Sequence, residues 1–88
     1  PFFGADLRWA GSEVAVAGSD GQPRRIDRLV QVADGTWWVL DYKLAGHPDA
    51  DPVLQAQLSG YRAAVQALVG APVRAAFVTA GGALIEPA

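Results

Sequence analysis

The order of apolar and polar residues in the first half of the chain predicts three β-strands. Residues 13–17 alternate weakly, residues 24–33 form a second run, and residues 36–44 are rich in aromatic and β-branched side chains. Clusters of glycine, serine and aspartate separate these runs, as expected for turns. Residues 1–11 have no clear period, so we expect an irregular lead-in or a short strand there.

The second half of the chain predicts one long helix. Asp51 is a good N-cap with Pro52 at the first helical position, and Gly70 is suited to end the helix near Val69. Apolar residues then recur at three- and four-residue intervals, as they do on one face of a helix. This predicted stripe consists of Leu54, Leu58, Tyr61, Val65 and Leu68.

Two further strands are expected after the helix. Residues 73–79 are apolar enough to form a central strand, and residues 83–86 can form a short last strand after the Gly-Gly turn. The resulting order of elements is β-β-β-α-β-β. We therefore predict an α/β fold in which a helix packs on a mixed sheet.

Composition narrows the class of protein. The chain has 88 residues, of which 51% are apolar, so it is expected to form one globular domain. The absence of cysteine excludes disulfides, iron–sulfur clusters and thiolate zinc sites. A net charge of −2 has the wrong sign for holding nucleic acid by bulk electrostatics. The chain has no apolar run of membrane-spanning length; since it begins at Pro1 and lacks methionine, we expect a fragment of a longer protein.

Candidate chemistry is concentrated at the end of the third predicted strand. Asp41 and Lys43 are two residues apart, so strand alternation places both side chains on one face of the sheet. Lys43 is the only lysine in the chain. A carboxylate beside an ammonium group can hold a divalent cation and position a water molecule. The alternative is a surface ion pair of little energetic consequence.

The turn at Asp34-Gly35 decides what lies opposite Asp41. A two-residue loop would pair Asp41 with Arg28, whereas a three-residue loop over residues 33–35 would place Asp27 directly opposite Asp41. Turn residues alone leave both open. Opposed carboxylates repel each other, and a cation between them would remove that cost. We predict the three-residue loop, with Gly35 at positive φ and both carboxylates within reach of one cation.

Four motifs, taken in order along the chain, resemble one known family. They are IDRLV at 26–30, WVLDYK at 38–43, Gln57 with Tyr61, and VRAAF at 73–77. Together they resemble the RecB/AddA-type PD-(D/E)XK nuclease domain, which stands at the C-terminus of UvrD-like helicases in bacterial double-strand-break repair. The resemblance covers roughly residues 12–87. It implies a restriction-endonuclease-like fold from which the family's N-terminal helices are missing.

The resemblance also implies roles for the residues around the Asp-x-Lys motif. Asp27 and Asp41 would ligate Mg²⁺ or Mn²⁺, with the carbonyl of Tyr42 as a third ligand. Lys43 would orient or help to deprotonate the attacking water and would stabilise charge in the transition state. These three charged residues are the predicted catalytic group.

Three more residues gain an implied role. Glu13 would be an accessory acid, although its position alone suggests a solvated charge at a strand end. Gln57 and Tyr61 lie one helical turn apart and would contact DNA near the cleavage site. Taken alone, they would be a surface amide beside a core tyrosine.

The implied function is that of a metal-dependent DNA exonuclease domain that hydrolyses phosphodiester bonds. Its expected partners are DNA, the ATP-dependent helicase domains of the same parent chain and a partner subunit, in the cytoplasm and away from membranes. The alternative is a catalytically inactive module that binds DNA or scaffolds a helicase complex. Because part of the family's site would lie upstream, we expect these 88 residues alone to have little or no nuclease activity.

Overall fold

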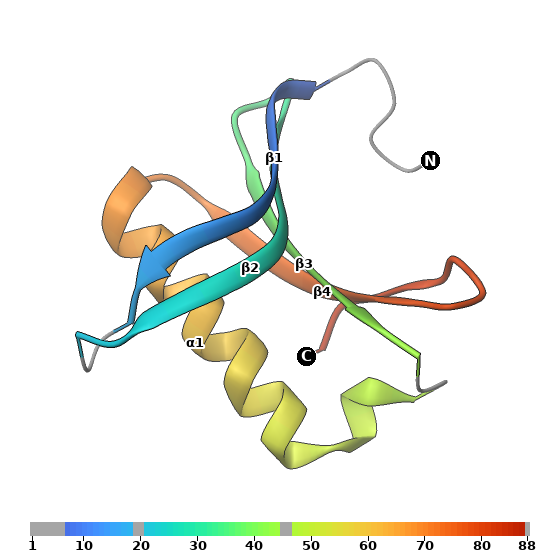
Figure 1. Ribbon diagram of the computed structural model, residues 1–88. Coiled ribbons are helices and arrows are strands. Elements are labelled where there is room, and N and C mark those ends of the chain that lie inside the picture. The colour runs from blue at the N-terminus through green and yellow to red at the C-terminus, as the bar shows by residue number, and fades with distance from the viewer. Residues whose placement is uncertain (1–6, 19–20, 45–46, 88) are drawn as a thin grey trace.

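A five-stranded sheet and one long helix form the described part of the chain, residues 7–18, 21–44 and 47–87, in this computed structural model (Figure 1). The strands follow the order β1-β2-β3-β4-β5; β3 and β4 are parallel and the other neighbours are antiparallel. The elements are β1 (Leu7–Ala17), β2 (Pro23–Val32), β3 (Trp37–Lys43), the 3₁₀ turn η1 (Pro48–Ala50), α1 (Pro52–Val69), β4 (Val73–Thr79) and β5 (Leu84–Ile85). The predicted α/β class and mixed sheet are confirmed.

The first strand is longer than its sequence pattern indicates. β1 pairs with β2 from Leu7 to Ala17, so the expected lead-in forms a strand from residue 7 onward, and residues 1–6 lie outside the described part. β1 is an edge strand in which only Val16 is fully buried. Because pairing with β2 satisfies the backbone without burying a full face, the strand needs no strict alternation.

The hairpin between β2 and β3 has the predicted three-residue loop. Arg28 pairs with Leu40 and Gln31 with Trp37, which is the register that places Asp27 opposite Asp41. The loop closes through the N–H of Gly35, which donates to the carbonyl of Val32 at 2.9 Å, and Gly35 has a φ of +94°. The two-residue alternative is thereby excluded.

Replacing Gly35 tests how strongly this turn depends on its backbone conformation. Gly35→Ala is expected to lower the free energy of unfolding by roughly 1–2 kcal/mol, because a Cβ disfavours positive φ. An added Cβ would lie 3.8 Å from the Arg8 guanidinium, which is ordinary contact, so the effect is conformational. The measurement is urea denaturation.

The matched control is Gly60→Ala, since Gly60 lies inside α1 with nothing within 4 Å of an added Cβ. This change is expected to raise stability by about 0.5–1 kcal/mol, because alanine restricts the unfolded chain and favours the helix. If both substitutions shift the free energy of unfolding in the same direction, the left-handed requirement at Gly35 is wrong.

The helix begins and ends where the sequence predicts. The carboxylate of Asp51 accepts from the N–H of Val53 at 2.9 Å, and Gly70 ends the helix in the left-handed conformation. Most of the predicted apolar stripe faces the sheet, but Leu68 is 69% exposed and that part of the prediction is wrong. In the last turn, Val69 contacts the core instead. Within the described residues, no helix is long and apolar enough to cross a membrane.

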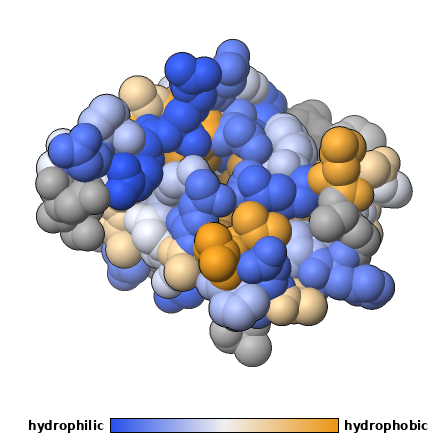
Figure 2. Space-filling view, turned by 60° about the horizontal axis from the view of Figure 1, so that its bottom comes forward, coloured by the Kyte–Doolittle hydropathy of each residue, from blue (hydrophilic) through white to orange (hydrophobic). Residues whose placement is uncertain are grey.

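Apolar side chains gather on both faces of the sheet. The face that α1 covers, called the helix side, carries the larger core cluster of Val16, Ile26, Leu29, Val39, Leu58, Tyr61, Ala64, Val65, Val73, Ala75 and Phe77. The opposite face carries Val30, Trp38, Leu40 and Ala76. The molecular surface shown in Figure 2 is mostly hydrophilic, with apolar residues in small areas.

Candidate functional site

The two predicted metal-ligating aspartates lie where β2 and β3 separate. The ladder between these strands ends at Arg28 and Leu40, and the same register sets Asp27 opposite Asp41 one step further. The N–H of Tyr42 donates to Oδ2 of Asp27 at 3.0 Å. The Asp27 carboxylate therefore accepts a backbone hydrogen bond from β3 just beyond the end of the ladder. This contact holds the carboxylate beside β3.

Asp41 is the one buried charged side chain in the described part of the chain. It is only 4% exposed, although it carries a carboxyl group. Its Oδ1 lies 3.4 Å from Nζ of Lys43, which confirms that the two side chains share a face. Its Oδ2 is enclosed and has no hydrogen-bond partner among the described residues. A buried carboxylate oxygen without a donor is unfavourable, so a proton or a cation would stabilise this site.

The electrostatics of the site follow from this burial. Burial, together with the adjacent Asp27 carboxyl, raises the pKa of Asp41 to about 6, because both favour the protonated form of Asp41. The ammonium group of Lys43 acts in the opposite direction on the pKa of Asp41. Asp41 therefore changes charge close to neutral pH, which is typical of functional carboxyl groups.

This arrangement fits a hard divalent cation bound largely through water. Asp27 and Asp41 supply carboxylate oxygens, and Tyr42, whose N–H donates to Asp27, follows Asp41 directly. Among the described residues, no group of three or more histidine, aspartate or glutamate side chains is placed to hold a metal. Mg²⁺ commonly binds through one or two carboxylates and keeps several waters, so two aspartates suffice for it.

Glu13 lies apart from this pair. It stands between Ser12 and Val14 on β1, at the level of Asp27, but its carboxylate is exposed and lies 3.5 Å from Arg25. Both partners are largely solvated, so the ion pair contributes little. The structure does not bring the predicted accessory acid to the two aspartates.

Glu13 has a different feature that the sequence did not indicate. Its φ is +53°, a conformation that non-glycine residues rarely adopt. Beside it on β2, Ile26 and Leu29 both belong to the helix-side core although they are three residues apart. Strand alternation is therefore broken at Asp27 and Arg28. A glutamate at position 13 does not predict a positive φ, so the sequence does not indicate this irregularity.

Gln57 and Tyr61 lie one turn apart on α1, as predicted, but they differ in burial. Gln57 is exposed, whereas Tyr61 is buried in the helix-side core. Both line a hollow of about 350 Å³ between α1 and the end of the β1–β2 hairpin, together with Gly18 and Arg24. The aspartate pair does not line this hollow.

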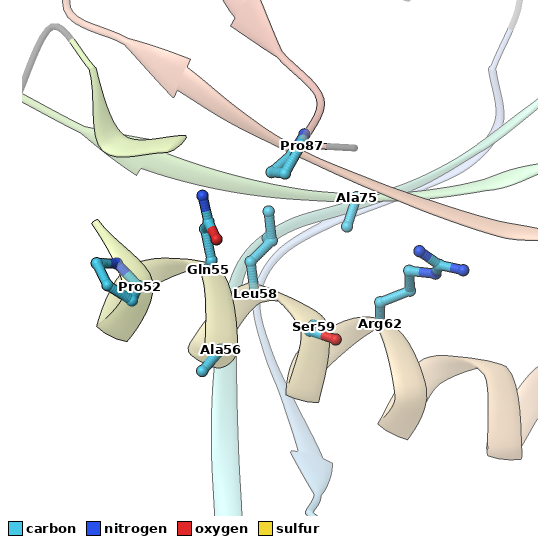
Figure 3. Close-up of a pocket in the computed structure, with 8 residues that line it drawn as sticks. All are labelled: Pro52, Gln55, Ala56, Leu58, Ser59, Arg62, Ala75 and Pro87. Atoms are coloured by element: carbon cyan, nitrogen blue, oxygen red, sulfur yellow. The ribbon is translucent and has the colours of Figure 1, made fainter. Parts of the chain in front are cut away.

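A second hollow, of about 390 Å³, lies on the other flank of α1. Figure 3 shows Gln55, Leu58 and Arg62 of α1 on one side, with Ala75 of β4 and Pro87 on the other. It contains none of the predicted site residues. Its single charged lining side chain, that of Arg62, is not accompanied by an acid or base that could carry chemistry with it.

A cleft at the carboxyl ends of β3 and β4 was missed by the sequence analysis. It measures about 280 Å³ and is lined by Tyr42, Lys43, Leu44, Val78, Thr79 and Ala80. Parallel pairing of Lys43 with Thr79 brings the two strand ends together. The only sequence signal for this cleft is the β-α-β order of the elements. That order predicts two parallel strands, and the carboxyl ends of parallel strands lie at the same edge of a sheet.

Comparisons with known families, curated proteins and solved structures gave no match. The function must therefore be inferred from the cluster that Asp27, Asp41 and Lys43 form.

Proposed function

We propose that this chain is a Mg²⁺-dependent DNA nuclease domain of the RecB/AddA type, with a restriction-endonuclease-like fold. It would act as the exonuclease part of a helicase–nuclease in double-strand-break repair. The observation that carries the proposal is the buried Asp41, which faces Asp27 and pairs with Lys43 while its Oδ2 lacks a donor among the described residues.

A purely structural ion pair does not account for this arrangement. One lysine could neutralise one carboxylate, but here a second carboxylate lies against the first and raises its pKa. Burying a charge with incomplete hydrogen bonding is destabilising, and it is tolerated mainly where a ligand or a reaction uses it. A site that binds a cation uses both carboxylates and the unpartnered oxygen.

Each residue of the cluster has a distinct role in the proposed reaction. Asp27 and Asp41 hold the cation, and the N–H of Tyr42 orients the Asp27 carboxylate at 3.0 Å. When bound, Mg²⁺ would activate water and neutralise charge on the phosphate. Lys43, whose side chain is 28% exposed, can reach solvent to orient the attacking water and to stabilise the charge that develops on phosphate oxygens.

Metal titration of the protein tests the proposal directly. We expect Mn²⁺ to broaden the backbone NMR signals of residues near Asp27 and Asp41, and Mg²⁺ to compete with it. Asp27→Asn and Asp41→Asn should each remove the effect, because each deletes one of the two carboxylates. Asp49→Asn in η1 is the matched control and should leave it unchanged, since Asp49 lies outside the cluster.

The cleavage assay separates an enzyme from an inactive module. In the intact protein, degradation of linear DNA should require the divalent cation and both aspartates. Selective metal binding without any cleavage would favour the alternative of a DNA-binding or scaffolding module. The absence of selective binding at Asp27 and Asp41 would exclude the proposed site.

A further inference from the structure

The hollow on the flank of α1 that Figure 3 shows lies apart from the proposed nuclease site. None of Asp27, Asp41 and Lys43 lines it, and the proposed reaction does not use it. Its volume of about 390 Å³ is within the range of pockets that bind small organic molecules. The N-terminal part of α1, one residue of β4 and the C-terminal segment at Pro87 form its walls.

The floor of this hollow is apolar. Leu58 of α1 and Ala75 of β4 lie there, and both side chains are buried in the helix-side core. The rings of Pro52 and Pro87 also line the hollow and present only carbon to it. Because contact with this floor removes hydrocarbon from water, the hollow favours a ligand with an apolar body.

The available hydrogen-bond donors of the hollow lie together on α1. Ser59 and Arg62 are three residues apart, so they are neighbours on one flank of the helix (Figure 3). The third polar lining side chain, that of Gln55, is already engaged, since its amide N–H donates to the carbonyl of Asp49. The hollow therefore offers a ligand one hydroxyl group beside one guanidinium group.

The positive charge of Arg62 is not used by an ion pair within the part of the chain that the structure describes. The acid that it influences is Glu86, but the Glu86 carboxylate binds Arg74, whose Nε donates to it at 2.9 Å. This hydrogen bond is the main cause of the lowered pKa of Glu86, and Arg62 lowers that pKa further only through its charge. Because Arg74 already neutralises Glu86, the exposed Arg62 can pair with an incoming anion.

One guanidinium and one hydroxyl group beside an apolar floor are suited to a singly charged anion. A planar carboxylate can accept two parallel N–H bonds from a guanidinium and still accept from a hydroxyl group. A phosphate monoester carries about two negative charges, and a single cation would leave part of that charge unpaired. We propose that the hollow binds a small organic carboxylate, with its apolar body on Leu58 and Ala75 and its carboxylate on Arg62 and Ser59.

Such a ligand would connect segments that are distant in the chain. Its carboxylate would contact α1, whereas its apolar body would also contact β4 and the segment at Pro87. A ligand with these contacts binds only the folded protein, so it should raise the free energy of unfolding as its concentration increases. Because the aspartate pair does not line the hollow, binding should not depend on a metal ion.

Titration of the protein with sodium hexanoate in EDTA, followed by NMR, tests the proposal. We expect saturable shifts in the backbone signals of Ser59, Arg62 and Ala75. Hexylammonium has a similar length and the opposite charge, so it should cause no such shifts. Acetate should bind at least about tenfold more weakly than hexanoate, because it lacks the methylene groups that the apolar floor would desolvate.

Substitutions on α1 separate the two polar contacts. Arg62→Ala is expected to weaken hexanoate binding about tenfold, because the charged contact is lost. Arg62→Lys should recover part of this affinity, since lysine keeps the charge without the planar fork. Ser59→Ala should weaken binding about threefold. Arg25→Ala is the matched control and should leave binding unchanged, because Arg25 is an exposed arginine of β2 that does not line the hollow.

Absence of saturable shifts with hexanoate would overturn the inference, and so would equal hexanoate affinities of wild type and Arg62→Ala. Equal binding of hexylammonium would also overturn it, since the hollow would then select apolar length and not an anion. None of these results affects the metal titration at Asp27 and Asp41, which judges the proposed function separately. Loss of affinity in Arg62→Ala with partial recovery in Arg62→Lys supports the carboxylate site.

Discussion

Lys43→Ala is expected to lower the rate of DNA cleavage by the intact protein about 10²-fold or more, which corresponds to roughly 3 kcal/mol of barrier. The ammonium group stands 3.4 Å from Asp41 Oδ1 and is the one charged group among the described residues that line the adjoining cleft. Its loss would leave the attacking water less well oriented and the transition-state charge less well stabilised. Metal binding should persist, because lysine is not a ligand.

The pH of this assay matters, since Lys43 also lowers the pKa of Asp41. Without the lysine, the pKa of Asp41 is expected to rise further, so protonation would compete with the cation near neutral pH. Cleavage and Mn²⁺ binding are therefore best compared at about pH 8, where Asp41 stays ionised. There, a loss of rate with retained metal affinity isolates the role of Lys43.

Two controls frame this result. Arg62→Ala removes a cation from a hollow that none of Asp27, Asp41 and Lys43 lines, and it should leave cleavage unchanged. Asp41→Ala should weaken metal binding itself and abolish cleavage, because it deletes a ligand. The helicase and ATPase activities of the proposed helicase–nuclease parent should survive both Lys43→Ala and Asp41→Ala. Normal cleavage by Lys43→Ala would show that the lysine only forms an ion pair, and would favour the scaffold alternative.

Asp41→Asn is expected to stabilise the metal-free protein at pH 8 by about 1–3 kcal/mol. Burial raises the pKa of Asp41 from its ordinary 3.8 to about 6. The folded protein with an ionised Asp41 is therefore less stable against unfolding than the folded protein with a neutral side chain at this position. Asparagine has the same shape without the charge, and its amide can donate a hydrogen bond toward Asp27. The measurement is urea denaturation of both proteins in EDTA.

The pH dependence of this difference has a definite sign. Because the pKa of Asp41 is higher in the folded than in the unfolded protein, protonation favours folding. The stability contribution of Asp41 is therefore complete below about pH 3.8 and is lost as the pH rises through about 6. Asp34 and Glu86 have lowered pKa values, owing to the Thr36 N–H and the Arg74 guanidinium respectively, so their contributions are lost only in acid.

Comparison with Asp41→Asn isolates this contribution from those of the other carboxylates. The advantage of the variant should shrink as the pH falls from 8 toward 4. Mg²⁺ should also reduce it, since a ligand that binds only the folded wild type stabilises that protein alone. If Asp41→Asn is destabilising at pH 8 in EDTA, the charge of Asp41 stabilises the fold through its ion pair. The interpretation of Asp41 as a ligand-binding carboxylate that costs stability would then be wrong.

The sequence by itself determined the elements whose causes are local. Asp51 and Gly70 set the ends of α1 because an N-cap carboxylate and a left-handed glycine act within one turn of the helix. Gly35 suits the three-residue loop that puts Asp27 opposite Asp41, but the turn residues also allowed a two-residue loop, so the register was established only by the structure. The contact between Asp41 and Lys43 followed from strand alternation alone.

Only the tertiary structure decided the properties that depend on distant segments. Residues 7–11 became strand because β2 offered backbone partners, and Leu68 stayed exposed because Val69 met the core in the last turn. The raised pKa of Asp41 likewise depends on the burial of its carboxyl group and on Asp27, and the cleft beside Tyr42 requires β4 to lie next to β3. The desolvation of a group depends on every atom that surrounds it. A sequence pattern with a period of two or 3.6 residues shows only which side chains share a face of one strand or helix, and not what packs against that face.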